Sequence, residues 1–338
     1  MPIKRISLLL LLAPALSACD GASSPEGVAP LSGSAIRAHL GVLADDSMYG
    51  RRAGSDHELR AARYIRGRFQ AVGLEPGVSG YLQSVPIPFP VDGVSGLVSQ
   101  NVLGVLPGKG SLAGEWVIIG AHYDHMGFSQ VNNSAVVLNG ADDNASGTAA
   151  LLEIARFMSD YAAEAGAEEE RRSIMFQAYG AEEVGLVGSI YYCEQPTVPM
   201  LDVVAMLNLD MLGRLRNDVL IVIGTSSSDD WADVFAEVSA PGMHLVFDDS
   251  SLRGSDHYCF YLQNRPVVFF HTGLHAEYHT PFDDVELINL AGLVRVADVV
   301  LDVLQEVASR PEPLVGHQVP SLTLGQPDAG VAPHALRR

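Results

Sequence analysis

Acidic and histidine residues recur in this sequence directly after short apolar runs. The positions are His122 with Asp124, Asp142 with Asp143, Glu182 with Glu183, Asp210, and His279. The runs at 116–120 and 173–179 are typical of strands that are buried on both faces. In open α/β sheets, ligands bind outside the carboxyl ends of the strands. The series therefore predicts one site that is built from several loops.

His122 and Asp124 have the spacing of residues that share one face of an extended chain. A metal-bound imidazole usually donates its second N–H to a carboxylate. Asp124 could orient His122 in this way, or it could contact the backbone around the site. His125 points to the opposite face and is predicted to be structural.

The paired carboxylates indicate hydrolysis assisted by metal ions. Asp142 and Asp143 repel each other unless a cation neutralises one of them, although helix capping is an alternative role. In a Glu-Glu pair, one carboxylate can bind metal while the other takes a proton from water. The same pair on an exposed loop would have no such role. Asp210 in an apolar stretch needs a partner such as a metal ion, whereas a lone loop histidine such as His279 is often a surface group.

The elements that position these residues alternate between helical and extended patterns. Apolar residues at helical spacing predict helices near 36–43, 59–72, 147–158 and 285–307. Apolar runs predict strands at 116–120, 173–179, 203–209, 220–223 and 266–270, with extended segments at 80–89 and 97–106. This alternation indicates an α/β protein. Because no linker divides the segment, residues 34–310 are predicted to form a single domain.

Both ends of the chain predict segments outside that domain. Residues 1–18 have the charged start and short apolar run of a signal peptide. Leu16-Ser17-Ala18-Cys19 resembles a bacterial lipobox, so we expect an exported protein with a lipidated Cys19 on a membrane surface. An ordinary signal peptide is the alternative. Residues 19–33 are predicted to be a flexible tether, and residues 311–338 a disordered, proline-rich tail.

The net charge and the number of cysteines argue against some classes of protein. Twenty-one basic and forty acidic residues give a net charge of −19, which argues against binding to nucleic acid. Cys193 and Cys259 form no disulfide framework by number. We expect both to be buried small hydrophobic residues, although a pair in an exported protein could form a bridge.

The ordered series His-x-Asp, Asp, Glu-Glu, Asp, His resembles the two-zinc exopeptidases of metallopeptidase family 28, including the bacterial leucyl aminopeptidases. The resemblance extends over nearly all of residues 34–310. It includes the stretches Gly50-Arg51-Arg52-Ala53-Gly54, Arg253-Gly254-Ser255-Asp256-His257 and Thr272-Gly273-Leu274-His275.

This resemblance implies a three-layer domain with a central mixed, mostly parallel sheet flanked by helices. It implies two zinc ions per chain and a metallo-aminopeptidase that acts on peptide substrates. The metal ligands carried over are His122 and Asp210 for one ion, Glu183 and His279 for the other, and Asp143 as the bridge. Glu182 would be the general base that acts on a metal-activated water, and Asp124 would support His122.

Two further details come from the same resemblance. The family's bridging aspartate stands three residues before the serine of Asp-x-x-Ser-Gly, and Ser146 therefore selects Asp143 over Asp142. The family also tends to have a cis peptide after that aspartate, which makes Asp143–Asn144 a candidate. Asp256 and His257 follow a Gly-Ser turn, where Asp256 could cap a helix or support the site.

Other functions remain as alternatives on the same fold. Aminoacylase-like two-zinc hydrolases carry a long lid after the Glu-Glu pair, and the spacing from Glu183 to Asp210 leaves no room for one. A glutaminyl-cyclase-like acyl transferase would use a smaller metal set. A non-catalytic metal-binding module would typically have lost ligands, and all five ligand positions are filled in this chain.

Overall fold

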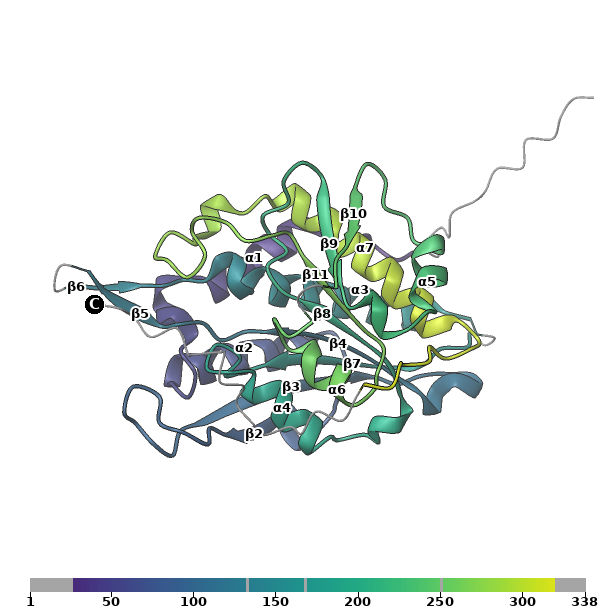
Figure 1. Cartoon of the computed structure of the whole chain (residues 1–338), viewed down its shortest axis with the longest axis horizontal. Helices are drawn as coiled ribbons and strands as arrows, with labels where there is room; N and C mark the ends of the chain where they lie inside the picture. Colours follow the sequence, from purple (N-terminus) through teal and green to yellow (C-terminus); the bar gives the residue numbers. More distant parts are fainter. Residues whose placement is uncertain (1–26, 132–133, 167–168, 250–251, 320–338) are drawn as a thin grey trace, which may run out of the picture.

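Strand β4 (Trp116–His122) lies at the centre of a nine-stranded sheet in the described part of the chain. The structure is a computed structural model that describes residues 27–131, 134–166, 169–249 and 252–319 (Figure 1). The strand order is β1-β3-β7-β4-β8-β11-β9-β10, and β2 also pairs with β3. The other strands of the sheet are β1 (Glu75–Pro76), β2 (Leu82–Pro86), β3 (Val98–Leu106), β7 (Ser173–Tyr179), β8 (Val203–Leu209), β9 (Val219–Ile223), β10 (His244–Phe247) and β11 (Val267–His271).

The sheet is mixed, which agrees with the predicted fold class. At its centre β7, β4, β8 and β11 run parallel. Antiparallel pairing joins β3 to β7 on one side and β9 to β11 on the other. The carboxyl ends of the four central strands therefore lie along one edge of the sheet.

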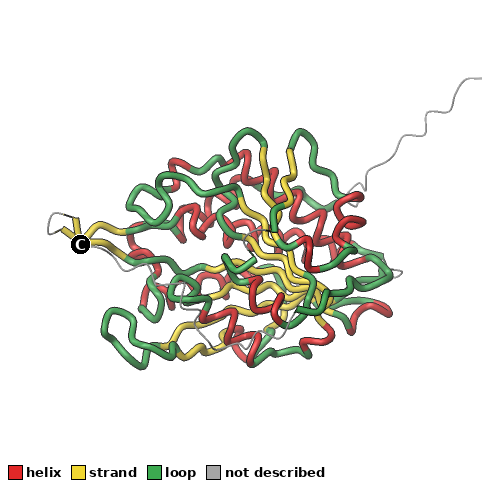
Figure 2. Tube along the Cα trace, in the orientation of Figure 1, coloured by secondary structure: helices red, strands yellow, loops and turns green. Residues whose placement is uncertain are grey.

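Helices cover both faces of this sheet, as Figure 2 shows. They are α1 (Gly33–Leu43), α2 (Asp56–Ala71), α3 (Gly147–Glu164), α4 (Val187–Glu194), α5 (Trp231–Glu237), α6 (His257–Leu262) and α7 (Leu290–Ser309). The alternation of side chains along β4 separates two cores. Ile119 packs in the core that contains α1, α2, α3, α5 and α7. Ile118 packs in the core that contains α4 and α6. The result is a three-layer α/β domain.

The helix boundaries follow from local side-chain chemistry. Ser32 caps α1 by accepting from the amide of Ala35, and Ser55 caps α2 by accepting from the amide of Glu58. Asn289 caps α7 through the amide of Gly292. These caps satisfy amides that have no partner within the helix. The last predicted helix consequently begins at Leu290 rather than near residue 285.

A small hairpin extends from the edge that carries the strand ends (Figure 1). It consists of β5 (Phe128–Val131) and β6 (Ser134–Val137). Its base packs on the segment that precedes α2, because the amide of Gly127 donates to the carbonyl of Gly50. A Cβ at Gly50 would lie 2.0 Å from the carbonyl oxygen of Gly127, so this contact requires glycine.

Two of the predicted flexible segments are partly packed. In the segment predicted as a tether, Val28 and Leu31 are buried in the core. In the segment predicted as a disordered tail, Leu314 is buried and the amide of Val315 donates to Asp230. Each contact involves an isolated apolar residue without periodicity, which is why the sequence pattern missed it.

Other predictions lie outside the described residues. These are the signal peptide at 1–18, the lipidated Cys19, the tether up to residue 26 and the tail from residue 320. Within the described ranges, no helix combines the length and the apolar character that crossing a bilayer requires.

Cys193 and Cys259 form a disulfide bond, with their Cα atoms 6.1 Å apart. Both cysteines are buried, as expected, but of the two states considered for them it is the bridge, given as the alternative, that the structure has. Cys193 lies in α4 and Cys259 in α6, so the bond joins the two helices on one face of the sheet. Sequence spacing could not reveal the pair, because the two helices meet only in the folded domain.

Candidate metal centre

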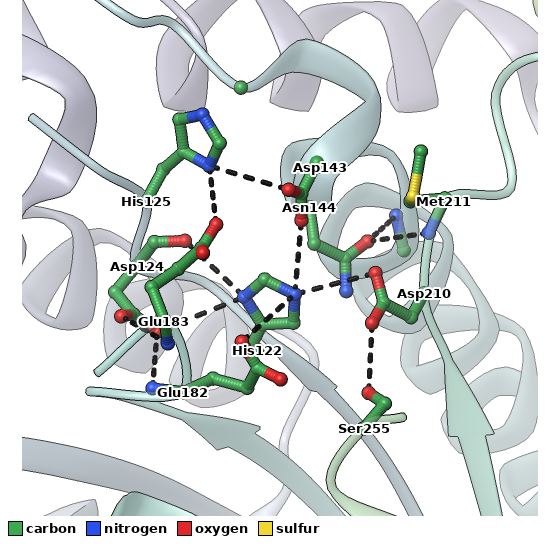
Figure 3. A network of polar contacts seen from close by, with 12 residues as sticks. His122, Asp124, His125, Asp143, Asn144, Glu182, Glu183, Asp210, Met211 and Ser255 are labelled. Atoms are coloured by element: carbon green, nitrogen blue, oxygen red, sulfur yellow. Dashed lines mark hydrogen bonds and ion pairs between the residues drawn. The ribbon is translucent and has the colours of Figure 1, made fainter. Parts of the chain in front are cut away.

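The predicted site residues converge at the carboxyl ends of the central strands, and Figure 3 labels all of them except His279. His122 is the last residue of β4, and Asp210 follows the last residue of β8. The turn after β7 carries Glu182 and Glu183, and the loop after β11 carries His279. Asp143 belongs to the irregular helical turn η4 (Ala141–Ser146), which precedes α3.

One group of donors surrounds the imidazole of His122. Its Nε2 lies 3.3 Å from Oδ1 of Asp143 and 3.3 Å from Oδ1 of Asp210. The three residues are buried and offer ligand atoms close enough together to share one ion. This is the predicted ligand set of the first ion.

A second group of donors uses the other carboxylate oxygen of Asp143. Nε2 of His279 lies 2.9 Å from Oδ2 of Asp143 and 3.2 Å from Oε2 of Glu183. Asp143 therefore presents Oδ1 to one group and Oδ2 to the other. A carboxylate with this arrangement can bridge two ions, which is the role predicted for it.

The donor atoms are suited to cations rather than to each other. Oδ1 of Asp210 and Nε2 of His279 are buried and make no hydrogen bond within the described residues, despite the short distances to neighbouring polar atoms. Two imidazoles and three carboxylates suit divalent ions that accept nitrogen and oxygen ligands. The residues therefore fit a centre of two metal ions.

Electrostatics in the metal-free protein reflect this crowding of charge. Burial acts to lower the pKa of His122, but Glu182 and Asp210 outweigh it and raise that pKa well above its ordinary value. Burial likewise opposes protonation of His279, but the nearby carboxylates of Asp143 and Glu183 outweigh it and raise the pKa of His279 to about 10. Both imidazoles thus hold protons where metal ions would replace them.

His125 was predicted to be structural, and the structure places it beside the site instead. Its Nδ1 lies 2.7 Å from Oε1 of Glu183 and 3.7 Å from Oδ2 of Asp143. His125, Glu183 and Asp143 thus also offer ligand atoms close enough together to hold a metal ion. This set shares both carboxylates with the group around His279. The alternation rule failed because the extended backbone of β4 ends at His122.

Asp124 contacts the backbone more closely than it contacts His122. Its carboxylate accepts the amide of Glu182 at 3.0 Å and the amide of Glu183 at 3.3 Å. Its Oδ1 lies 3.8 Å from Nδ1 of His122, whereas its own carbonyl oxygen lies 3.3 Å from that nitrogen. Of the two roles expected from the sequence, the backbone contact is the stronger.

Glu182 lies on the same side of the site as His122 but belongs to neither donor group. Its Oε2 is 4.0 Å from Nε2 of His122. Burial raises the pKa of Glu182 well above its ordinary value; His122 opposes this rise, and the nearby Asp256 and Glu183 add to it. A carboxyl with a raised pKa can both accept and release a proton near neutral pH.

Asp142 is directed away from the donor groups. Its Oδ1 accepts the amide of Gly213 at 2.6 Å, and its Oδ2 lies 3.2 Å from Nε2 of His275. The amides of Asp142 and Asp143 both donate to Asp283. The peptide bond between Asp143 and Asn144 is cis, as the family resemblance predicted.

Ser255 and Asp256 support the site from the start of α6. The hydroxyl of Ser255 donates to Oδ2 of Asp210 at 2.8 Å. Asp256 stands at the N-cap position, but its side chain makes no capping bond to the helix. Burial raises its pKa to about 7. The capping role considered for Asp256 is therefore wrong, and its carboxyl lies close enough to influence Glu182.

Comparison with known proteins agrees with this geometry. Residues 101–304 match the model of peptidase family M28. The chain belongs to that family. The M28 match covers β3 to α7, and so it includes every predicted ligand.

Individual relatives resemble the chain over part of their length. Aminopeptidase YwaD of Bacillus subtilis is 28% identical over 222 residues, which are 63% of this chain and 45% of that protein. The chain spans about half the length of the first curated M28 relatives that it matches.

Two solved structures share the fold. The zinc aminopeptidase BSAP from Bacillus subtilis has a TM-score of 0.64 at 17% identity, with 83% of this chain and 96% of that chain covered. Bacteroides thetaiotaomicron glutaminyl cyclase bound to N-acetylhistamine has a TM-score of 0.63 at 20% identity, with 82% and 98% covered. The M28 fold is thus common to both kinds of protein.

Some residues that shape this M28 site were missed by sequence reasoning. They are Arg51, Glu58, His125, Ser255 (as a contact of Asp210) and Asp283. For Glu58 a signal was present, because it lies at helical spacing with the buried residues Ala61, Ala62 and Ile65. A glutamate in an apolar helical stripe predicts a buried carboxylate with specific partners.

Proposed function

We propose that this chain is a zinc-dependent aminopeptidase that removes residues from the amino terminus of peptides. The observation that carries the proposal is the division of the site. Two donor groups share Asp143, while Glu182 stands next to them and belongs to neither. The M28 family and the name of the relative YwaD support the same activity.

The site residues have two roles, metal binding and proton transfer. His122 and Asp210 would hold one zinc ion, Glu183 and His279 the other, and Asp143 would contact both. Zinc ions at these positions supply Lewis acidity, which lowers the pKa of water and polarises a peptide carbonyl. Glu182 would accept a proton from the attacking water and deliver it to the departing amine.

The charge of the site favours an amino terminus as the substrate end. Despite burial, contacts with histidines hold the pKa values of Asp143 and Glu183 below their ordinary range, so these carboxylates gather negative charge at the strand ends. A free substrate amine is positive and would be attracted to these carboxylates. A substrate with a blocked amino terminus lacks that attraction.

Substitution of the two adjacent glutamates tests this proposal. Glu182→Ala should keep two zinc ions per chain, while kcat on leucine p-nitroanilide falls by about 10²–10⁴-fold. Glu183→Ala should lose zinc, because it removes a ligand. An active Glu182→Ala enzyme with its zinc intact would refute the assignment of the base.

An acyl transferase is the second candidate, and the fold shared with glutaminyl cyclase favours testing it. The wild-type protein should be given leucine p-nitroanilide, the same compound with a blocked amine, and a peptide with amino-terminal glutamine. Cyclisation of the glutamine without hydrolysis of the first compound would replace the aminopeptidase proposal.

We also propose that the protein is exported and held at a membrane surface by a lipid on Cys19. The charged start and the Leu-Ser-Ala-Cys segment support this location. The disulfide between Cys193 and Cys259 supports it independently, because such bonds persist in oxidising compartments. Cys19→Ala should remain unprocessed or lose the lipid-anchored membrane fraction, and release of the wild-type protein in a soluble, unlipidated form would contradict the anchor.

A further inference from the structure

Glu58 is a buried carboxylate that lies behind the turn carrying Glu182 and Glu183. It projects from the first turn of α2 and is 1% exposed. Its Oε2 accepts the amide of Gly54 at 2.6 Å. Its Oε1 accepts the hydroxyl of Ser99 on β3 and, at 3.1 Å, the amide of Ala181. One side chain thus connects α2, β3 and the turn after β7.

The turn is held by two carboxylates through three successive amides. Ala181 donates to Glu58 at 3.1 Å, Glu182 donates to Asp124 at 3.0 Å, and Glu183 donates to Asp124 at 3.3 Å. Asp124 is already part of the site, whereas Glu58 comes from a helix that precedes the M28 match at residues 101–304.

We propose that Glu58 is a positioning residue for Glu182. It fixes the peptide group between Gly180 and Ala181 and thereby sets the direction in which the turn leaves β7. The kinetic part of this proposal rests on the proposed function, whereas the structural part does not.

Local geometry shows why this peptide group needs to be fixed. Ala181 has φ of 56°, a left-handed conformation that residues other than glycine rarely adopt. A Cβ at Gly180 would lie 2.6 Å from Oε1 of Glu58 and 2.2 Å from Oγ of Ser99. The chain therefore passes directly against the carboxylate and turns there. Without the acceptor, the Ala181 amide would be buried with no partner, and the turn would relax.

The free-energy cost of burying the Glu58 carboxylate argues against a role in packing alone. Burial raises its pKa well above the ordinary value, and the nearby Asp124 raises it further. Two carboxylates that are buried close together destabilise a fold unless specific partners offset the cost. All the hydrogen-bond partners of Glu58 given above are donors, and one of them belongs to the turn.

The test compares Glu58→Ala and Glu58→Gln with Glu153→Ala. Glu153 is an apt control because it is also 1% exposed and also accepts a backbone amide, that of Ser32 at 2.7 Å. Its helix α3 contacts the N-terminal segment at that point rather than the turn. Glutamine keeps one oxygen acceptor for Ala181, so Glu58→Gln should retain more function than Glu58→Ala.

Hydrogen exchange on metal-free protein provides a readout that does not depend on activity. In Glu58→Ala the amides of residues 180–187 should exchange about tenfold faster or more, while those residues keep wild-type protection in Glu153→Ala. With zinc present, kcat on leucine p-nitroanilide should fall about 10- to 100-fold, with KM within about twofold and two zinc ions retained.

Several results would overturn the proposal. Unchanged exchange at residues 180–187 in Glu58→Ala would do so, even if the wild-type protein proved to have no aminopeptidase activity. Zinc loss in proportion to the loss of activity would assign Glu58 to assembly of the metal site instead. If Glu58→Ala fails to fold, Glu58→Met decides, because methionine fills a similar space but offers the Ala181 amide no acceptor. Wild-type exchange at residues 180–187 together with wild-type kcat in that variant refutes the proposal.

Discussion

Replacement of Arg51 by methionine should destabilise the protein strongly, although Arg51 touches none of the predicted ligands. Its guanidinium is fully buried and donates to the carbonyls of Leu43, Tyr123, Asn139 and Gly140. These bonds hold the chain between His122 and Asp124, and also the loop that enters η4 before Asp143. Methionine fills a similar space without any donor.

The magnitude follows from two opposing contributions. Four buried carbonyls lose a charged donor, and at about 1–3 kcal/mol each the loss is about 4–12 kcal/mol. Burial lowers the pKa of Arg51 to about 10 despite attraction to Asp124 and Asp143. A fall of that size corresponds to about 3 kcal/mol of charge burial that methionine would relieve. The difference between the two contributions is a fall of about 1–9 kcal/mol in the free energy of unfolding, with a central value of about 5 kcal/mol.

Urea unfolding followed by circular dichroism in the presence of a chelator measures this difference without metal ions. Arg51→Lys keeps a charge but has three donors for four carbonyls, so it should fall between methionine and wild type. Arg60→Met is the control, because Arg60 makes one exposed bond to the carbonyl of Ser47. If Arg51→Met unfolded within about 1 kcal/mol of wild type, the reasoning from unsatisfied buried carbonyls would be refuted.

Three further predictions concern other parts of the molecule. Burial and Arg68 lower the pKa of His39 to about 4, so the neutral ring stabilises the fold above pH 6.5 and this contribution is lost as pH falls toward 4. His39→Gln should therefore lose less stability than wild type between pH 6.5 and 4 in thermal melts, and parallel losses would contradict this assignment. Replacing Cys193 and Cys259 by serine should lower the free energy of unfolding by about 2–4 kcal/mol, and reductant should then have no further effect on the variant. His125→Ala should weaken zinc binding about 10- to 100-fold in calorimetry. His125→Asn can still donate to Glu183 and should recover part of the affinity. Equal zinc affinity in the wild type and both variants would show that His125 does not contribute to the site.

The parts of the fold that the sequence predicted are those with strong local patterns. Strands β7 and β8 have the predicted boundaries, since each is a mostly apolar run that is buried on both faces. Helix α4 was not predicted, and α6 was expected only as a helix that could begin near Asp256. Each is at most eight residues long and is placed by packing against its neighbour and by the disulfide. Short elements of this kind depend on contacts that are distant in sequence.

The candidate site was predictable for a related reason. Each of the five ligand positions ends or follows a strand, or lies in the turn before a helix, and the parallel centre of the sheet brings these positions together. The residues behind the ligands were not predictable in this way. Arg51 and Glu58 act through backbone groups at Tyr123 and Ala181, and no side-chain pattern marks a carbonyl or an amide that needs a partner.

The order in which these strands occur along the chain has a consequence for biosynthesis. The innermost strand β4 is made early, but β8 and β11, which complete its side of the sheet, come from the last half of the chain. His279 emerges after all of them. A chain that is still being made, or that ends before this loop, can gather His122 and Asp143 but lacks a donor of the second group. Under the proposed function, a growing chain therefore cannot hydrolyse peptides. Peptidase activity begins only when nearly the whole domain has been synthesised.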